Sequence, residues 1–333
     1  MIISRSPLRV SLFGGGTDFP EWFKKNNGLV IGGTINKYNY IHVRYLPNIF
    51  KFNYRLRYFK TEMVKKIKNI KHGPYREILK IFNLDNSQIE IIHTSDLPAL
   101  SGLGSSSSST VSTINAISAL KGSFINKKNL SNLAIKIERE VLGENVGCQD
   151  QIFSSFGGFN CIRFNSDFDF SVENLINDKK KLSLLNNSSI LIWSGIQRKG
   201  QILEKEKIAK IKKKSITQNL KNIQSVTEKA YEEFSKSSWD LEKIGKLMNE
   251  YWQQKKHLSR GITNKKIDKI CGIANTNGAY GVKLLGAGGG GFIYILCSPK
   301  KKKILLKKLS KFGNVNFQFE NSGSSIIYNK QLI

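Results

Sequence analysis

A glycine-broken loop that runs into a series of serines is the part of this chain best suited to bind an anion. Residues 97–110 read LPALSGLGSSSSST, and apolar residues then recur at helical spacing. This layout directs backbone N–H groups, a helix N-terminus and hydroxyls at one place, which is typical of a phosphate site. The loop lacks the lysine of GxxxxGK[ST] and the last glycines of GxGxxG, so neither of those nucleotide-binding motifs describes it.

Two more glycine-rich loops lie far from the first in the sequence, at residues 14–16 and 286–291. Glycine allows a backbone to approach a ligand closely, although a single loop of this kind often serves only a turn. The three loops together predict one cleft in which backbone from separate parts of the chain surrounds a ligand.

Asp150 is the acidic residue of greatest chemical interest. It stands in the segment GCQDQ (residues 147–151), after an expected helix that carries Glu138 and Glu140. Its neighbours on either side are amides, and the setting is otherwise small and apolar. The structural alternative is that Asp150 caps a helix that begins near Gln151.

Composition limits the classes of protein to consider. The chain has 333 residues, 40% hydrophobic residues and a formal net charge of +28. The excess is mostly lysine in helix-like stretches without interleaved aromatics, so we expect no nucleic-acid partner but some attraction for phosphorylated ligands. No apolar run approaches the roughly 18 residues of a membrane span, and the N-terminus does not resemble a signal peptide. We therefore expect no membrane association and a cytoplasmic location.

The order of expected elements predicts an α+β protein rather than a doubly wound sheet. The charged tract at 165–188 is the best candidate for a domain boundary. Strands are expected at residues 2–13, 29–35, 38–45, 89–93, 159–164, 190–193, 281–285 and 292–297, and helices at 60–83, 105–120, 128–142, 201–235, 239–257, 263–276 and 299–310. Pro74 is expected to interrupt the first of these helices.

The three loops also occur, in order, within motifs that resemble those of the GHMP-superfamily kinases. The motifs are PLRVSLFGGGTD (residues 7–18), Pro98 with GLGSS (102–106), KLLGAGGGG (283–291) and the element around Asp150. The resemblance covers nearly the whole chain. It implies two domains: a ribosomal protein S5 domain 2-like, ATP-binding N-terminal domain (residues 1–170) and a ferredoxin-like C-terminal domain (residues 185–333).

The resemblance further implies ATP and Mg²⁺ as cofactors and assigns a role to each matching residue. Asp150 would take the proton of the attacking hydroxyl, and Arg9 would stabilise the transferring charge. Ser106 and Glu138 would hold Mg²⁺, with Glu140 as the second choice for the carboxylate. The residues expected to bind ATP are Pro98, Gly102, Leu103, Gly104, Ser105, Ser106, Ser107, Gly288 and Gly289.

Within the family, the opening segment and GCQDQIFSSFGG are most similar to the D-glycero-D-manno-heptose 7-phosphate kinases. This similarity implies phosphorylation of an anomeric hydroxyl on a small-molecule sugar phosphate, and it is compatible with a homodimer. The residues expected at the acceptor are Gly16, Thr17, Asp18, Gln149 and Arg198.

Other acceptors and other roles stay open from the residues alone. Galactokinases have GEHTDY where this chain has GGGTDF, which argues against galactose itself. A C1 kinase of an unphosphorylated hexose or deoxyhexose, similar to galactokinase or fucokinase, is the alternative. A catalytically silent ligand sensor is a further reading, against which the presence of Arg9, Ser106, Glu138 and Asp150 argues.

Overall fold

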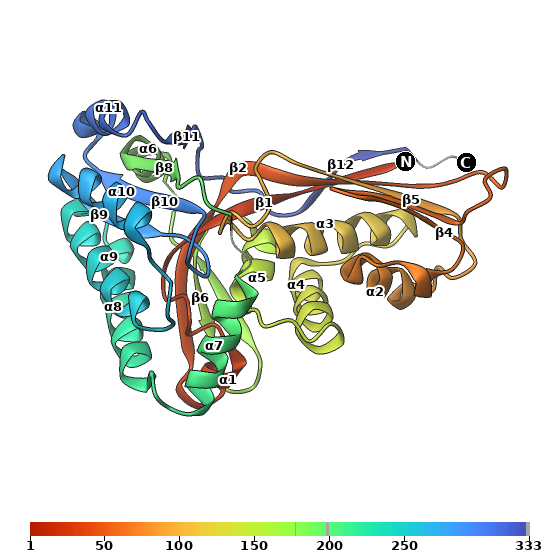
Figure 1. The fold of residues 1–333 in the computed structure, drawn as a ribbon, viewed down its shortest axis with the longest axis horizontal. Helices are drawn as coiled ribbons and strands as arrows, with labels where there is room; N and C mark the ends of the chain where they lie inside the picture. Colours follow the sequence, from red (N-terminus) through yellow and green to blue (C-terminus); the bar gives the residue numbers. More distant parts are fainter. Residues whose placement is uncertain (177, 198–199, 331–333) are drawn as a thin grey trace.

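Two β-sheets with helices packed against them make up the protein, seen here in a computed structural model that describes residues 1–176, 178–197 and 200–330 (Figure 1). The strands are β1 (Ile2–Phe13), β2 (Gly28–Tyr45), β3 (Tyr54–Arg57), β4 (Thr61–Val64), β5 (Ile89–Ser95), β6 (Phe159–Phe164), β7 (Phe170–Asn174), β8 (Ser189–Trp193), β9 (Ala279–Leu284), β10 (Phe292–Cys297), β11 (Gly313–Val315) and β12 (Ser325–Asn329). The helices are α1 (Pro20–Asn26), α2 (Gly73–Ile81), α3 (Ser105–Leu120), α4 (Lys127–Ile135), α5 (Gln149–Phe156), α6 (Lys179–Ser188), α7 (Gln201–Lys212), α8 (Thr217–Ser235), α9 (Leu241–Lys256), α10 (Lys265–Thr276) and α11 (Pro299–Lys308), with a short 3₁₀ turn η1 (Ile67–Asn69) and a π-helix η2 (Lys136–Val141). The mixed content confirms the α+β prediction.

The first sheet is built on the long strand β2. Its strand order is β12-β1-β2-β5-β3-β4, and β6 and β7 extend it from the first half of β2. We expected two strands, at 29–35 and 38–45, and this was wrong. The register with β1 shifts where Pro7 faces Tyr38 and Leu8 faces Ile35. Two residues are left over there, so the interruption in the sequence pattern is a bulge within one continuous strand.

The last strand returns to this first sheet. β12 pairs antiparallel with β1, with Ile2 opposite Asn329 and Arg5 opposite Ser325. Figure 1 shows β12 beside β1 near the N-terminus, far from the helices of residues 201–276. The end of the chain therefore packs with the N-terminal sheet rather than with the second one.

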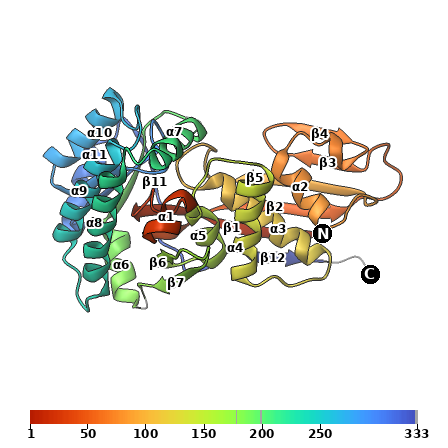
Figure 2. The same ribbon diagram turned by 90° about the horizontal axis from the view of Figure 1, so that it is seen from below.

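The second sheet has four antiparallel strands in the order β11-β8-β10-β9. Numbered along the chain, this is a 4-1-3-2 order, with helices between the first and second strands and between the third and fourth. This β-α-β-β-α-β pattern is the predicted ferredoxin-like arrangement. Figure 2 shows helices α8 to α11 gathered at this end of the molecule and α2 with β3 and β4 at the other.

Three expected helices differ from the structure. Residues 60–83 contain a strand and a 3₁₀ turn before α2, and Pro74 occupies the first turn of α2 instead of interrupting a longer helix. Residues 201–235 form two helices, α7 and α8, with Lys214 at φ 58° between them. The expected helix 128–142 ends as the π-helix η2, a wider turn that is frequent at functional sites.

A shared hydrophobic core joins the two sheets. Phe234 of α8 lies 6.3 Å from Phe13 and 5.1 Å from Phe159, measured between ring centroids, and both partners belong to the first sheet. Lys283 of β9 donates hydrogen bonds to the carbonyl oxygens of Ser11 (2.9 Å) and Leu12 (2.6 Å). These contacts fix the second sheet against the end of β1, where the first glycine loop begins. No helix among the described residues is long and apolar enough to cross a bilayer.

We expect Phe234→Ala to lower the free energy of unfolding by about 3–5 kcal/mol, because it empties a ring-sized space in this shared core. Phe124→Ala, which removes a ring that is 93% exposed, is the matched control and should change stability by no more than about 0.5 kcal/mol. Urea unfolding followed by tryptophan fluorescence measures both. Equal losses for the two variants would mean that Phe234 does not join the sheets.

Candidate active site

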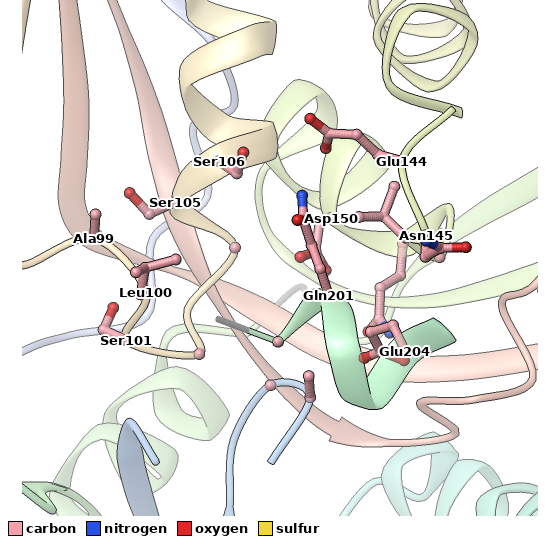
Figure 3. A pocket seen from close by; sticks show the side chains of 18 of the residues that line it. Ala99, Leu100, Ser101, Ser105, Ser106, Glu144, Asn145, Asp150, Gln201 and Glu204 are labelled. Carbon is pink, nitrogen blue, oxygen red and sulfur yellow. The ribbon is translucent and has the colours of Figure 1, made fainter. Parts of the chain in front are cut away.

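A cavity of about 630 Å³ lies where the two sheets meet, and all three glycine loops reach it. Its size is that of a small-molecule site. Figure 3 shows Ser105 and Ser106 on one side and Glu204 of α7 on the other, with Asp150 and Gln201 overlapping in the middle of the view. The predicted convergence of the loops on one cleft is therefore what the structure has.

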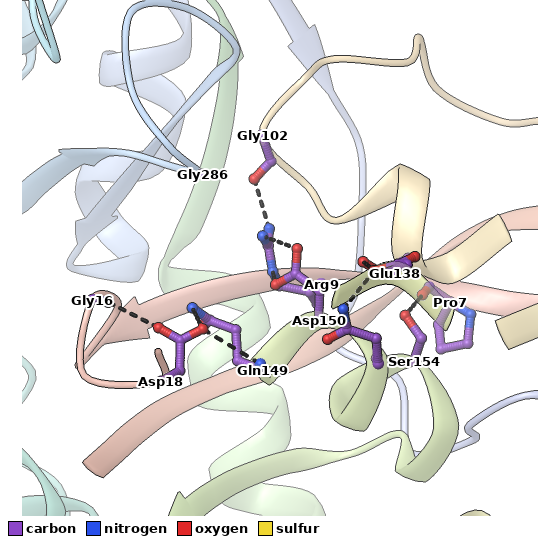
Figure 4. Close-up of polar contacts among 12 residues, drawn as sticks. Pro7, Arg9, Gly16, Asp18, Gly102, Glu138, Gln149, Asp150, Ser154 and Gly286 are labelled. Carbon is purple, nitrogen blue, oxygen red and sulfur yellow. Dashed lines mark hydrogen bonds and ion pairs between the residues drawn. The ribbon is translucent and has the colours of Figure 1, made fainter. Parts of the chain in front are cut away.

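Arg9 and Asp150 form a bidentate ion pair inside this cavity (Figure 4). Arg9 Nε donates to Asp150 Oδ1 at 2.8 Å, and the second terminal nitrogen donates to Oδ2 at 2.7 Å. The remaining terminal nitrogen donates to the carbonyl oxygen of Gly102 at 2.6 Å. The carboxylate of Asp150, in the first turn of α5, does not cap that helix. It is 23% exposed and thus reachable from the cavity.

The serine-lined loop lies directly against this pair. Gly104 has φ +73° and immediately precedes α3, and a Cβ there would lie 3.2 Å from Asp150 Oδ2. Gly102 packs against the third loop, because a Cβ on Gly286 would come within 2.5 Å of its Cα. The N-terminus of α3 therefore lies beside Asp150, and the backbone of the third glycine loop packs against the residues that precede it. It offers unpaired N–H groups to an anion.

Asp18 also lines the cavity, and hydrogen bonds from the first glycine loop and from Gln149 hold its carboxylate in place (Figure 4). Its Oδ1 accepts from the backbone N–H of Gly16 at 2.9 Å, and its Oδ2 accepts from Gln149 Nε2, also at 2.9 Å. A Cβ on Gly147 would lie 1.9 Å from Oδ2, so only glycine fits beside this carboxylate. Gln149 Oε1 is buried without a hydrogen-bond partner, and a hydroxyl of a ligand would satisfy it.

Glu138 is buried rather than on a solvated helix face, and it lies behind the serine helix. Its Oε2 accepts from Ser107 Oγ at 2.8 Å and from Gln151 Nε2 at 2.5 Å, whereas its Oε1 has no hydrogen-bond partner among the described residues. Burial raises the pKa of the carboxyl to about 7. Glu140, the second choice, is exposed. A buried carboxylate oxygen without a donor is where a cation would be stabilised.

The expected site residues separate into two groups. Those that line the cavity are Arg9, Gly16, Asp18, Gly102, Gly104, Ser105, Ser106, Gln149, Asp150 and Gly288. The expected site residues that do not line it, among those the structure describes, are Thr17, Pro98, Leu103, Ser107, Glu138 and Gly289. The Thr17 hydroxyl donates hydrogen bonds to the carbonyl oxygens of Gly14 and Leu29, so it stabilises the first glycine loop. Arg198 lies outside the described residues.

An aromatic part of the cavity was missed by sequence reasoning. Its lining includes Tyr58, Phe59, His72, Pro74 and His93. Burial lowers the pKa of both histidines to about 4, so their rings are neutral at pH 7. Aromatic rings of this kind pack against flat ring systems. The aromatic pair Tyr58-Phe59 was the available signal in the sequence, and the mistaken helix at 60–83 drew attention away from it.

Two buried lysines that line the cavity, Lys207 and Lys255, were also missed. Both occur in lysine-rich helices, α7 and α9. In the sequence they could not be told apart from the solvated lysines around them.

Comparisons with known proteins agree with this architecture. The GHMP kinases N terminal domain matches residues 63–158, and the GHMP kinases C terminal domain matches residues 230–315. D-glycero-alpha-D-manno-heptose 7-phosphate kinase of Campylobacter jejuni is 30% identical over 320 residues, which cover 93% of each chain. A bifunctional fucokinase/GDP-fucose pyrophosphorylase of Arabidopsis thaliana is 23% identical over 95% of this chain but only 32% of its own.

Among solved structures, a D-glycero-D-manno-heptose 1-phosphate kinase from Bacteroides thetaiotaomicron has a TM-score of 0.81 and 22% identity, covering 99% of this chain and all of that one. At this identity the likeness concerns the fold. Because both family domains match and a relative is 30% identical over nearly the whole length, the chain belongs to the GHMP kinases and is an ATP-dependent sugar kinase.

Proposed function

We propose that this kinase phosphorylates the anomeric C1 hydroxyl of a sugar that already carries a phosphate, namely D-glycero-D-manno-heptose 7-phosphate, and yields the 1,7-bisphosphate. The observation that carries the proposal is the Arg9–Asp150 pair, which lies between the serine-lined loop and Asp18 in a single cavity. The 30% identity to a heptose 7-phosphate kinase supports the choice of sugar.

In the proposed reaction, donor and acceptor meet at Asp150. The Gly102–Ser106 loop holds the ATP phosphates. Asp18 and the side-chain oxygen of Gln149 accept hydrogen bonds from hydroxyls of the sugar. Asp150 takes the proton from the C1 hydroxyl of the sugar. The C1 oxygen bonds to the γ-phosphorus as the bond between that phosphorus and the ADP oxygen breaks. Arg9 holds the Asp150 carboxylate in place and stabilises the negative charge in transfer.

The residues behind the loop fit a divalent cation. Glu138 offers a buried carboxylate oxygen without a partner, and Ser106 presents its hydroxyl in the cavity one residue from the serine that bonds Glu138. Oxygen ligands of this kind suit Mg²⁺, which otherwise retains water and phosphate oxygens. When bound, Mg²⁺ neutralises charge on the ATP phosphates.

Asp150→Asn should lower kcat by about 100- to 10,000-fold, because the amide cannot accept the hydroxyl proton. The affinity for ATP, measured by calorimetry, should change little, because the loop that holds the phosphates is intact. Asp167→Asn, in an exposed turn, is the control for loss of one carboxylate. A kcat near that of the wild type with a normal unfolding curve would assign proton removal to another group.

The acceptor is tested with a panel in which ADP release is coupled to NADH oxidation. We expect D-glycero-D-manno-heptose 7-phosphate to be preferred over the free heptose, galactose and fucose. The product should no longer reduce alkaline copper, because phosphorylation at C1 blocks the reducing end. Turnover of free hexoses without turnover of the heptose phosphate would support the hexose kinase alternative instead.

Glu138→Gln should raise the Mg²⁺ concentration for half-maximal rate by at least about tenfold, since a metal-ligand carboxylate is lost. The exposed Glu140→Gln is the control on the same helix and should leave it unchanged. Because the pKa of Glu138 is raised to about 7, a proton occupies it as the pH falls through 7. The Mg²⁺ requirement of the wild type should therefore increase below pH 7, and that of Glu138→Gln should not. If the pH profiles of the wild type and of Glu138→Gln were parallel, Glu138 would not be a ligand of the metal.

A further inference from the structure

Two buried lysines line the cavity together with Asp18, the carboxylate proposed to bind the acceptor sugar. Lys207 and Lys255, from α7 and α9, are 3% and 5% exposed and both line the cavity together with Asp18. Lysine is rarely buried unless it is paired, because removal of its charge from water is costly. Two of them on one wall therefore require an explanation beyond packing.

Lys255 has no carboxylate partner within the described chain. Its Nζ donates to the carbonyl oxygens of Gly286 at 2.6 Å and Leu284 at 3.4 Å. An ammonium has three donors, so one is left for the cavity. Burial, and next the charge of Lys207, lower the pKa of Lys255 to about 7, while Glu204 and Asp18 oppose this shift. The group thus lies close enough to Lys207 for the two to repel each other.

Lys207 lies next to the segment that follows the first glycine loop and carries Asp18. Its Nζ is 5.0 Å from the ring centroid of Phe19, which directly follows Asp18. Its ion-pair partner is Glu204, one turn earlier on α7, and Glu204 also lines the cavity. Lys207 therefore has one paired carboxylate and Lys255 has none, while the other carboxylate nearby, Asp18, accepts hydrogen bonds from Gly16 and Gln149.

We infer that Lys207 and Lys255 form the subsite for the phosphate that the acceptor sugar already carries, an inference that rests on the proposed function. A phosphate monoester brings up to two negative charges and three acceptor oxygens, which match two ammonium groups in a water-poor wall. The ATP phosphates have their own site, made by the serine-lined loop and the N-terminus of α3. Lys207 lies against Phe19, which follows Asp18, and Lys255 binds the carbonyl oxygen of Gly286 in the third glycine loop.

Glu204 gives the inference a second and opposite consequence. A phosphate at Lys207 must approach the carboxylate of Glu204, which is 15% exposed and already forms an ion pair with that lysine. Loss of the carboxylate charge removes this repulsion and frees a donor of Lys207. Substitutions at the lysines and at Glu204 should therefore change the preference for a phosphorylated acceptor in opposite directions.

The experiment measures the ratio of kcat/KM for heptose 7-phosphate to kcat/KM for the free heptose, with the free heptose also assayed as a competitive inhibitor. Lys207→Met and Lys255→Met should each lower this ratio by about 10- to 100-fold, the range of a lost charged hydrogen bond. Glu204→Gln should raise it. Lys205→Met removes an exposed lysine from the same helix and should leave the ratio within about twofold of the wild type.

The possible results separate this inference from the proposed function. A wild-type enzyme without preference for the phosphorylated acceptor would contradict the proposed function itself. A wild-type preference that persists in both lysine variants would overturn the subsite alone. Equal losses for both acceptors, with the ratio constant, would also overturn it, because the lysines would then act on the transferred group or on folding. Should Lys255→Met not fold, as judged by thermal unfolding, Lys207→Met and Glu204→Gln decide the question.

Discussion

The bidentate contact between Arg9 and Asp150 is the interaction on which the rest of the site depends. It joins the middle of β1 to the first turn of α5, which are 141 residues apart in the chain. Because Arg9 also binds the carbonyl of Gly102, the same guanidinium fixes the loop that precedes the serine helix. Each of the three guanidinium nitrogens of this buried arginine donates a hydrogen bond, so the carboxylate of Asp150 is held at one point in space.

Backbone packing without side chains is the second constraint. Gly102 lies against Gly286, Gly147 lies against the carboxylate of Asp18, and Gly104 lies against Asp150. A methyl group at any of these positions would come within 3.2 Å of a neighbouring atom. Glycine therefore allows these close approaches, and the contact of Gly102 with Gly286 brings together two loops that are far apart in the sequence.

Sequence reasoning succeeded where a local pattern has a single structural meaning. Residues 105–120 are helical with the predicted ends, and Asp150, Asp18 and the three loops share one cavity. It failed where tertiary contacts decide. The bulge opposite Pro7 joins two apparent strands, and Pro74 begins a helix that seemed to be interrupted there, so the aromatic wall with His72 was overlooked. Lys207 and Lys255 resemble their solvated neighbours in composition, and only their packing against Phe19 and Gly286 distinguishes them.

The most direct test of the account is a crystal structure of the protein with heptose 7-phosphate and a non-hydrolysable ATP analogue. The account predicts a hydrogen bond between the C1 hydroxyl and an Asp150 carboxylate oxygen, with the γ-phosphate at the N-terminus of α3 and in line with that hydroxyl. A sugar bound with C1 turned away from Asp150, or a nucleotide whose phosphates avoid the serine-lined loop, would contradict it.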